Sequence, residues 1–136
     1  MSRHSLLALA LALASLASCG GDSSSDDYQM AVDAANAKRA EAISLAPASP
    51  CAAVQQCANL QLVQPQAHCT AVDYRPYSLA SPTADAASAA AAEERALAIH
   101  AVAIAPPPVT ACSALVVQPP DLACTANTCQ VATGAR

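Results

Sequence analysis

The pattern of apolar and polar positions predicts a helix over residues 28–45. Its thin apolar stripe consists of Tyr28, Val32, Ala35 and Ile43. Asp26 or Asp27 can cap the start of this helix, and Pro47 follows its end. Because the stripe is narrow, the helix is expected either to stand as a stalk or to dock loosely on the rest of the chain.

Two strands and a second helix are predicted next. Residues 59–64 alternate between apolar and polar, residues 65–68 form a turn, and residues 70–74 form a strand with Thr70, Val72 and Tyr74 on one face. The second helix opens at Pro82, runs through an alanine tract, and ends near Ala105 before three prolines.

The last part of the chain predicts a second pair of strands. A third strand at 113–118, a turn at 119–121 and a fourth strand at 128–133 follow from the apolar pattern and from Pro119-Pro120-Asp121. The order helix, two strands, helix, two strands indicates an α+β fold. We expect one small disulfide-stapled domain over residues 28–136, with an antiparallel sheet packed by one or two helices.

The N-terminus has the three parts of a secretory signal. Arg3 supplies the positive charge, and an apolar stretch of leucine and alanine runs from Leu6 to Leu16, which is too short to span a bilayer. Small residues follow at Ala17 and Ser18. Residues 1–18 are therefore predicted to be a signal peptide.

The sequence Leu16-Ala17-Ser18-Cys19 resembles the lipobox of bacterial lipoproteins. This resemblance implies that the Cys19 thiol receives a diacylglyceryl group, that cleavage occurs just before Cys19, and that the new amino group is acylated. Several acyl chains together anchor a protein firmly. The alternative is an ordinary secreted protein with a chance cysteine near its cleavage site.

Residues 19–27 are expected to be a flexible lipidated tether, because they are rich in glycine, serine and aspartate. In the lipoproteins of Gram-negative bacteria, aspartate directly after the cysteine tends to retain the protein in the inner membrane. Gly20 stands there in this chain. The resemblance thus implies a periplasm-facing protein in the cell envelope, with the outer membrane favoured over the inner one.

Composition indicates that apolar burial alone stabilises this domain weakly. The chain has no Trp, no Phe and only three Tyr, and alanine buries little area. Six cysteines remain besides Cys19, and an even number in an exported chain predicts three disulfides. They are Cys51, Cys57, Cys69, Cys112, Cys124 and Cys129.

The cysteine spacings leave fifteen connectivities formally open. A hairpin turning at 119–121 favours the pair Cys112–Cys129, and the different heights of Cys57 and Cys69 on their hairpin argue against a bridge between them. A metal site is the competing interpretation of these cysteines, and it is disfavoured because the chain has neither CxxC nor HExxH. No metal or cofactor is expected.

Two halves of the chain show partial similarity. Eleven residues separate Cys57 from Cys69, and Thr-Ala follows Cys69; the same spacing separates Cys112 from Cys124, and Thr-Ala again follows the second cysteine. An old duplication and a coincidence in an alanine-rich chain both remain open, because Cys51 and Cys129 have no counterparts.

The stretch from Cys51 to Cys129 resembles a group of small exported cysteine-rich bacterial proteins without known function. The shared features are Gln-Cys at Gln56-Cys57, a second cysteine at Cys69, Tyr-x-x-Tyr-Ser at residues 74–78, a helix, and a cysteine-containing tail. The chain has Thr70-Ala71-Val72 where the group has Gly-Gly-Pro. The resemblance implies a single domain and no particular activity.

Several kinds of chemistry are disfavoured by what the chain lacks. Only Gly20, Gly21 and Gly134 occur, so phosphate-binding loops and the nucleophile elbow are excluded. After removal of Arg3 with the signal peptide, the chain has ten acidic and five basic residues and no cluster of basic ones. This charge distribution argues against nucleic-acid binding. His68 and His100 are expected to be solvated, and so is the helix face with Glu93 and Glu94.

We therefore expect a membrane-anchored envelope lipoprotein that is not an enzyme and has a structural or partner-binding role. The membrane, through the lipid, and an envelope protein are its expected partners. Tyr74, Arg75 and Tyr77 are a possible contact surface, with the core as the competing place for Tyr74. An inhibitor of a secreted hydrolase is the alternative function. A thiol oxidoreductase is the weakest candidate function, since redox-active cysteines usually occur as CxxC and this chain has none.

Overall fold

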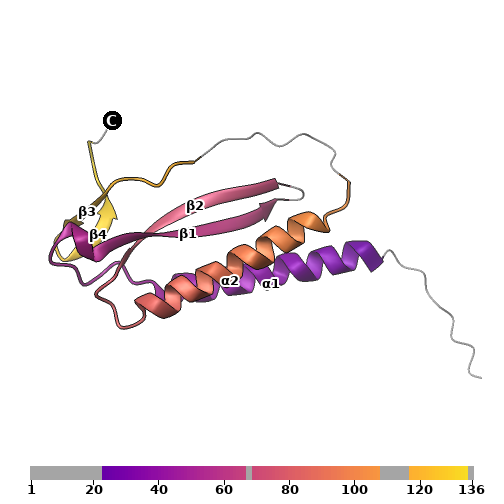
Figure 1. Cartoon of the computed structure of the whole chain (residues 1–136), viewed down its shortest axis with the longest axis horizontal. Helices are drawn as coiled ribbons and strands as arrows, with labels where there is room; N and C mark the ends of the chain where they lie inside the picture. Colours follow the sequence, from indigo (N-terminus) through magenta and orange to yellow (C-terminus); the bar gives the residue numbers. More distant parts are fainter. Residues whose placement is uncertain (1–22, 67–68, 108–116, 135–136) are drawn as a thin grey trace, which may run out of the picture.

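Two helices, two short antiparallel sheets and one 3-10 turn make up the described part of the domain (Figure 1). The computed structural model describes residues 23–66, 69–107 and 117–134. The elements are α1 (Ser23–Leu45), η1 (Val54–Gln56), β1 (Cys57–Gln66), β2 (Cys69–Ser78), α2 (Ala84–Ala103), β3 (Leu122–Thr125) and β4 (Thr128–Val131). The predicted α+β class and the order of elements are confirmed.

The helix α1 begins earlier than the sequence pattern suggests. Residues 23–27 were expected in the flexible tether, but they form the first turns of α1. Asp26 lies in the first turn, where a negative charge complements the helix dipole. The helix is not a free stalk, because Ala35 and Ala42 are almost completely buried.

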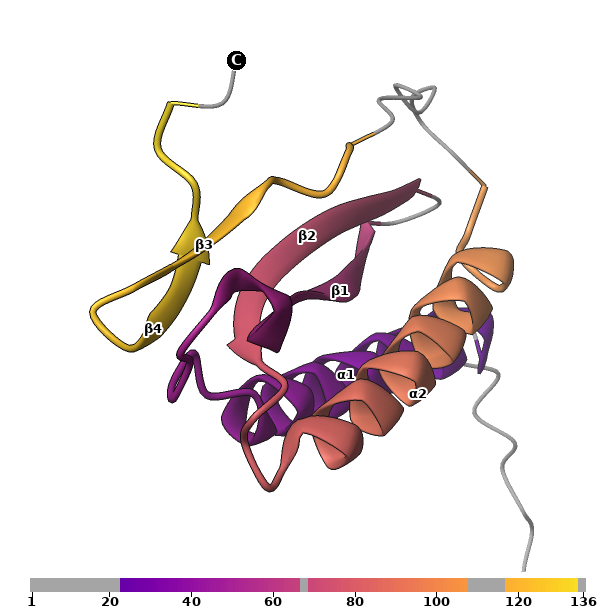
Figure 2. The same ribbon diagram turned by 60° about the vertical axis from the view of Figure 1, so that its left-hand side comes forward.

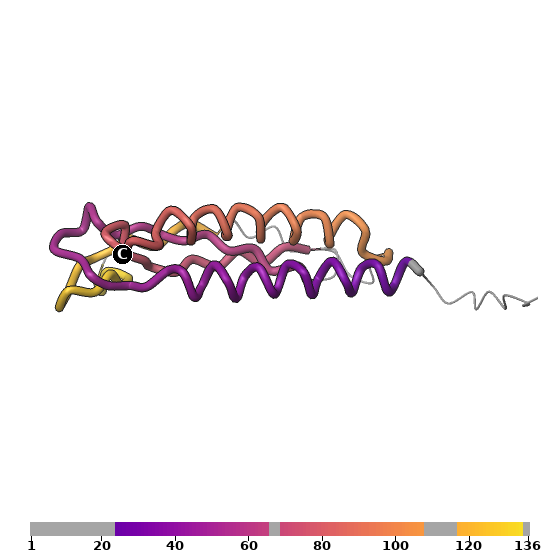
Figure 3. The backbone as a smooth tube through the Cα atoms, turned by 90° about the horizontal axis from the view of Figure 1, so that it is seen from below, coloured from indigo at the N-terminus to yellow at the C-terminus, as the bar shows by residue number. Residues whose placement is uncertain are grey.

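The two helices run antiparallel, side by side, along the length of the molecule (Figure 3). Alanines fill most of their shared face and allow the two backbones to approach closely. On α2 the buried positions recur every three or four residues, as expected for one helix face. They are Ala84, Ala87, Ala90, Ala91, Glu94, Ala98 and Ala101.

A polar contact joins the start of α2 to the end of α1. Thr83 stands at the N-cap of α2 but makes no side-chain cap hydrogen bond there. Its hydroxyl instead donates to the carbonyl of Leu45 at 2.7 Å. This bond satisfies one of the carbonyls left free at the end of α1.

Strands β1 and β2 have ten residues each and form an antiparallel hairpin, and both strands are longer than predicted at both ends. Pro65 lies in β1, paired with Thr70, and not in the predicted turn. Leu60, Leu62 and Tyr77 share the face that packs against the helices. In Figure 2 the helix pair lies on one side of this hairpin and β3–β4 on the other.

The opposite face of the hairpin is covered by the chain leading into β3. The Asn59 side-chain amide donates to the carbonyl of Pro120 at 2.8 Å, and the Tyr74 hydroxyl donates to that of Val117 at 3.4 Å. The domain thus has three layers: the helices, the β1–β2 sheet and this C-terminal segment.

The second hairpin differs from the one predicted. Its turn is Ala126-Asn127, not residues 119–121, and it joins β3 to β4. Ala126 and Asn127 have positive φ angles of 50° and 61°, the requirement of a tight two-residue hairpin turn. Residues 117–118 of the predicted third strand have no regular structure, and residues 113–116 lie outside the described residues.

Candidate functional site

Four of the six cysteines meet at the end of the molecule opposite the start of α1. Cys51 is bonded to Cys124 and Cys57 to Cys129. The expected pair Cys112–Cys129 is wrong, because the true hairpin turn brings Cys129 beside the first residue of β1. Cys57 and Cys69 are not bridged, as expected: they lie at opposite ends of the β1–β2 ladder.

Cys69 is also disulfide-bonded, and its partner lies outside the described residues. Cys112 and the expected lipidation residue Cys19 lie outside them as well, as does His68. Disulfide bonding, predicted from the number of cysteines, is therefore confirmed for the five cysteines that the structure describes.

The loop between Cys124 and Cys129 is held on both sides. Each flanking cysteine is bridged to the segment 51–57, and the carbonyl of Asn127 accepts a hydrogen bond from the Cys51 N–H at 3.2 Å. Thr125, Ala126 and Asn127 are nevertheless exposed. The result is a short exposed loop with a fixed conformation.

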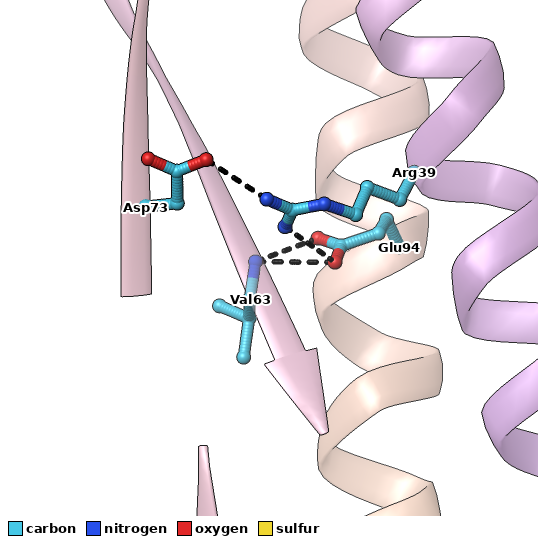
Figure 4. Close-up of polar contacts among 4 residues, drawn as sticks. All are labelled: Arg39, Val63, Asp73 and Glu94. Atoms are coloured by element: carbon cyan, nitrogen blue, oxygen red, sulfur yellow. Dashed lines mark hydrogen bonds and ion pairs between the residues drawn. The ribbon is translucent and has the colours of Figure 1, made fainter. Parts of the chain in front are cut away.

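A second group of polar residues lies between the helices and the sheet (Figure 4). The Glu94 side chain is only 1 % exposed, and its two oxygens accept the Val63 N–H at 3.1 and 3.0 Å. In a two-stranded sheet, alternate N–H groups of each strand point away from the partner strand. Glu94 therefore satisfies a backbone donor at the open edge of β1.

Arg39 of α1 links Glu94 to β2. Its Nη2 donates to Asp73 Oδ2 at 2.8 Å, while its Nη1 lies 3.9 Å from Glu94 Oε1. The second distance is an ion pair but too long for a hydrogen bond. Burial raises the pKa of Glu94, and the Val63 N–H, Arg39 and Arg95 oppose this increase.

The burial of Glu94 corrects the expectation of a solvated helix face. Glu93 does face solvent and pairs with Lys38 at 2.8 Å, but Glu94, one position on, points into the core. The burial of Glu94 could have been predicted from its spacing, because it lies three or four residues from Ala91 and Ala98 on the buried helix face. A carboxylate this deeply buried is inaccessible to a substrate, so the arrangement favours a structural role.

The three residues of the predicted contact surface are separated by the fold. Tyr77 is 6 % exposed and belongs to the core. Tyr74 is half-buried under the C-terminal segment, and Arg75 is exposed. A contact surface made of all three residues is therefore not formed. His100 is exposed in the last turn of α2, as expected, and Asp121 is exposed just before β3.

Comparison of the chain with protein-family models, with curated proteins and with solved structures finds no match. In the part of the chain that the structure describes, neither helix has the length and apolar character needed to cross a membrane.

Proposed function

We propose that this protein is a lipid-anchored envelope protein that holds a disulfide-bonded domain at the membrane surface and acts by binding. The observation that carries the anchor is the apolar stretch from Leu6 to Leu16 followed by Leu16-Ala17-Ser18-Cys19. The proposed location is the periplasm-facing side of the outer membrane. This proposal rests on the resemblance of the motif to a lipobox and on Gly20, which stands where aspartate would favour the inner membrane.

The position of the anchor relative to the domain supports this role. Cys19 precedes the start of α1 by four residues, which span at most about 14 Å. The 23 residues of α1 extend roughly 35 Å further. Figure 1 places the start of α1 and the β3–β4 hairpin at opposite ends. A lipid on Cys19 would thus leave the loop 125–128 at the end farthest from the attachment point.

The anchor is tested by intact mass and detergent partition. We expect the wild-type protein, expressed in a Gram-negative host, to carry a diacylglyceryl group and further acylation on Cys19 and to enter the detergent phase. The Cys19→Ala protein should remain in the aqueous phase. An unmodified wild-type protein cleaved elsewhere and found in the aqueous phase would refute the anchor.

Binding, as opposed to catalysis, is supported by the lack of a matched set of reactive groups among the described residues. Within the described ranges, two pairs of carboxylates each share a cation: Glu41 and Glu93 both contact Lys38. Asp73 and Glu94 both contact Arg39, and Glu94 is buried. The remaining described histidine, His100, is exposed at a helix end.

A matched pair of variants tests the binding surface. Thr125→Arg adds a bulky charge to the exposed loop between the disulfides, and Asn36→Arg adds the same side chain to an exposed position on α1. We expect photo-crosslinking of an envelope protein in membranes to fall at least tenfold for Thr125→Arg and to stay unchanged for Asn36→Arg. Equal crosslinking by both variants would show that this loop is not the contact.

An inhibitor of a secreted hydrolase is the second candidate, and one observation favours it. An exposed loop fixed between two disulfides, such as Thr125–Thr128, suits insertion into an enzyme cleft because little conformational entropy is lost on binding. The oxidised mature protein should then inhibit at least one of a panel of secreted proteases and glycosidases, and Thr125→Arg should abolish that inhibition.

A further inference from the structure

The bridges Cys51–Cys124 and Cys57–Cys129 bring four sulfur atoms to the same end of the molecule. The Sγ atoms of Cys51, Cys57 and Cys129 all lie within 4.8 Å of one another, and Cys124 is bonded to Cys51. In a tetrahedral zinc site, metal–sulfur bonds of about 2.3 Å place the sulfurs about 3.8 Å apart. Three sulfurs already lie close together, and the fourth, of Cys124, is bonded to Cys51 Sγ, so the bonded sulfurs would have to separate to surround one ion.

Two short backbone units supply these cysteines in pairs. Cys51 and Cys57 flank η1, while Cys124 and Cys129 face each other across the β3–β4 hairpin. The four residues between Cys124 and Cys129 match the spacing of zinc ligand pairs, and the other pair has five. Each disulfide connects one unit to the other, so both units already face a common centre.

The two units are also joined by bonds that do not involve sulfur. The Cys51 N–H donates to the carbonyl of Asn127 at 3.2 Å, and the Cys129 N–H donates to that of Ala48 at 2.7 Å. Neither bond depends on an S–S link, so both can form again around a bound ion after the disulfides are reduced. They would keep the four thiols close together and reduce the entropy lost when a metal ion binds.

We propose that the reduced protein binds one Zn²⁺ ion through Cys51, Cys57, Cys124 and Cys129. A dithiol reductant supplies the electrons. Breaking the two S–S bonds takes up four electrons and four protons, and two dithiol molecules become disulfides. Zinc binding then releases the four thiol protons, because the thiolate is the ligand. In the reverse step, two molecules of a small disulfide take up four electrons and four protons as the four thiolates re-form the two bridges, and the ion is released.

The experiment uses the mature chain, fully reduced and handled without oxygen. Titration with Co²⁺ reports the geometry by absorption, and competition with a chelator gives the Zn²⁺ affinity. We expect tetrahedral thiolate coordination that saturates at one equivalent, together with native-like circular dichroism in the presence of Zn²⁺. Cys124→Ser and Cys129→Ser should each weaken Zn²⁺ binding at least about 100-fold.

Cys69→Ser is the matched control. Cys69 pairs with Gln66 at the far end of the β1–β2 ladder from Cys57, about 30 Å away along the strand. Its substitution should leave the Co²⁺ spectrum and the Zn²⁺ affinity unchanged. Equal weakening in all three variants would indicate unspecific binding to an unfolded chain and overturn the proposal. So would a reduced wild-type protein that gives no tetrahedral spectrum.

Discussion

Glu94 shows how one residue can define the interior of a domain with few large side chains. It lies in a helix face made otherwise of alanine, and its carboxylate holds the edge of β1 through the Val63 N–H. An unpaired strand edge is a site of unwanted association, and a covering helix prevents it. Arg39 compensates part of the buried charge and continues the contact to Asp73 on β2.

The raised pKa of Glu94 predicts a specific dependence of stability on pH. Between the unfolded value near 4.5 and the higher folded value, the native state binds more protons than the unfolded state. The free energy of unfolding should therefore decrease as the pH rises through this window. Urea denaturation of the wild-type and Glu94→Gln proteins should show this decrease in the wild type alone.

The groups facing Glu94 are Arg39 of α1, Arg95 of α2 and the Val63 N–H of β1, with Asp73 on the far side of Arg39. Glu93→Gln serves as the control, because Glu93 is exposed and pairs with Lys38. This variant should keep the wild-type pH dependence. A stability difference between wild type and Glu94→Gln that stays constant, or increases with pH, would contradict the assignment.

Long helices and strands with a periodic apolar pattern were predictable from the sequence, and short ones were not. The pattern predicted α1, β1, β2 and α2, because each repeats its apolar spacing over many residues. The turn of the second hairpin was missed because Ala126 occupies a position that usually carries asparagine or glycine. The two bridges between segment 51–57 and this hairpin were not predicted either, because the spacing of the cysteines alone does not reveal which loops meet.

The strained turn at Ala126 predicts that a glycine there stabilises the domain. Ala126 has a φ of 50°, which costs an L-residue about 1–2 kcal/mol but costs glycine nothing. Ala126→Gly should therefore stabilise the domain by about 0.5–1 kcal/mol after the extra chain entropy of glycine is counted. Thermal unfolding of the oxidised protein measures the change.

Ala123→Gly provides the comparison for this turn variant. Ala123 lies in β3, where the backbone is extended and glycine should destabilise by about 0.5–1 kcal/mol. Each variant removes one methyl group, from a left-handed backbone at Ala126 and from an extended backbone at Ala123. Destabilisation by both substitutions would show that the turn is not strained.

The whole molecule combines a small alanine-rich core with covalent links at one end. The bridges Cys51–Cys124 and Cys57–Cys129 span 73 and 72 residues, and closure of a loop of this length stabilises a fold by about 4 kcal/mol in the chain-entropy model. The number of cysteines predicted that disulfides support the fold. Their pairing required the three-dimensional structure.

The described fold depends on the pairing of these cysteines, which peptide mapping without reduction can determine. No Lys or Arg separates Cys51 from Cys57 or Cys124 from Cys129, so trypsin cannot distinguish the pairings. Digestion with pepsin at acid pH keeps exchange between disulfides slow, because little thiolate is present. Fragmentation of the linked peptides in the mass spectrometer, between Cys51 and Cys57 and between Cys124 and Cys129, then distinguishes the pairings. We expect peptides joined through Cys51–Cys124 and Cys57–Cys129. Peptides joined through Cys112–Cys129 or Cys51–Cys57 would contradict the fold described.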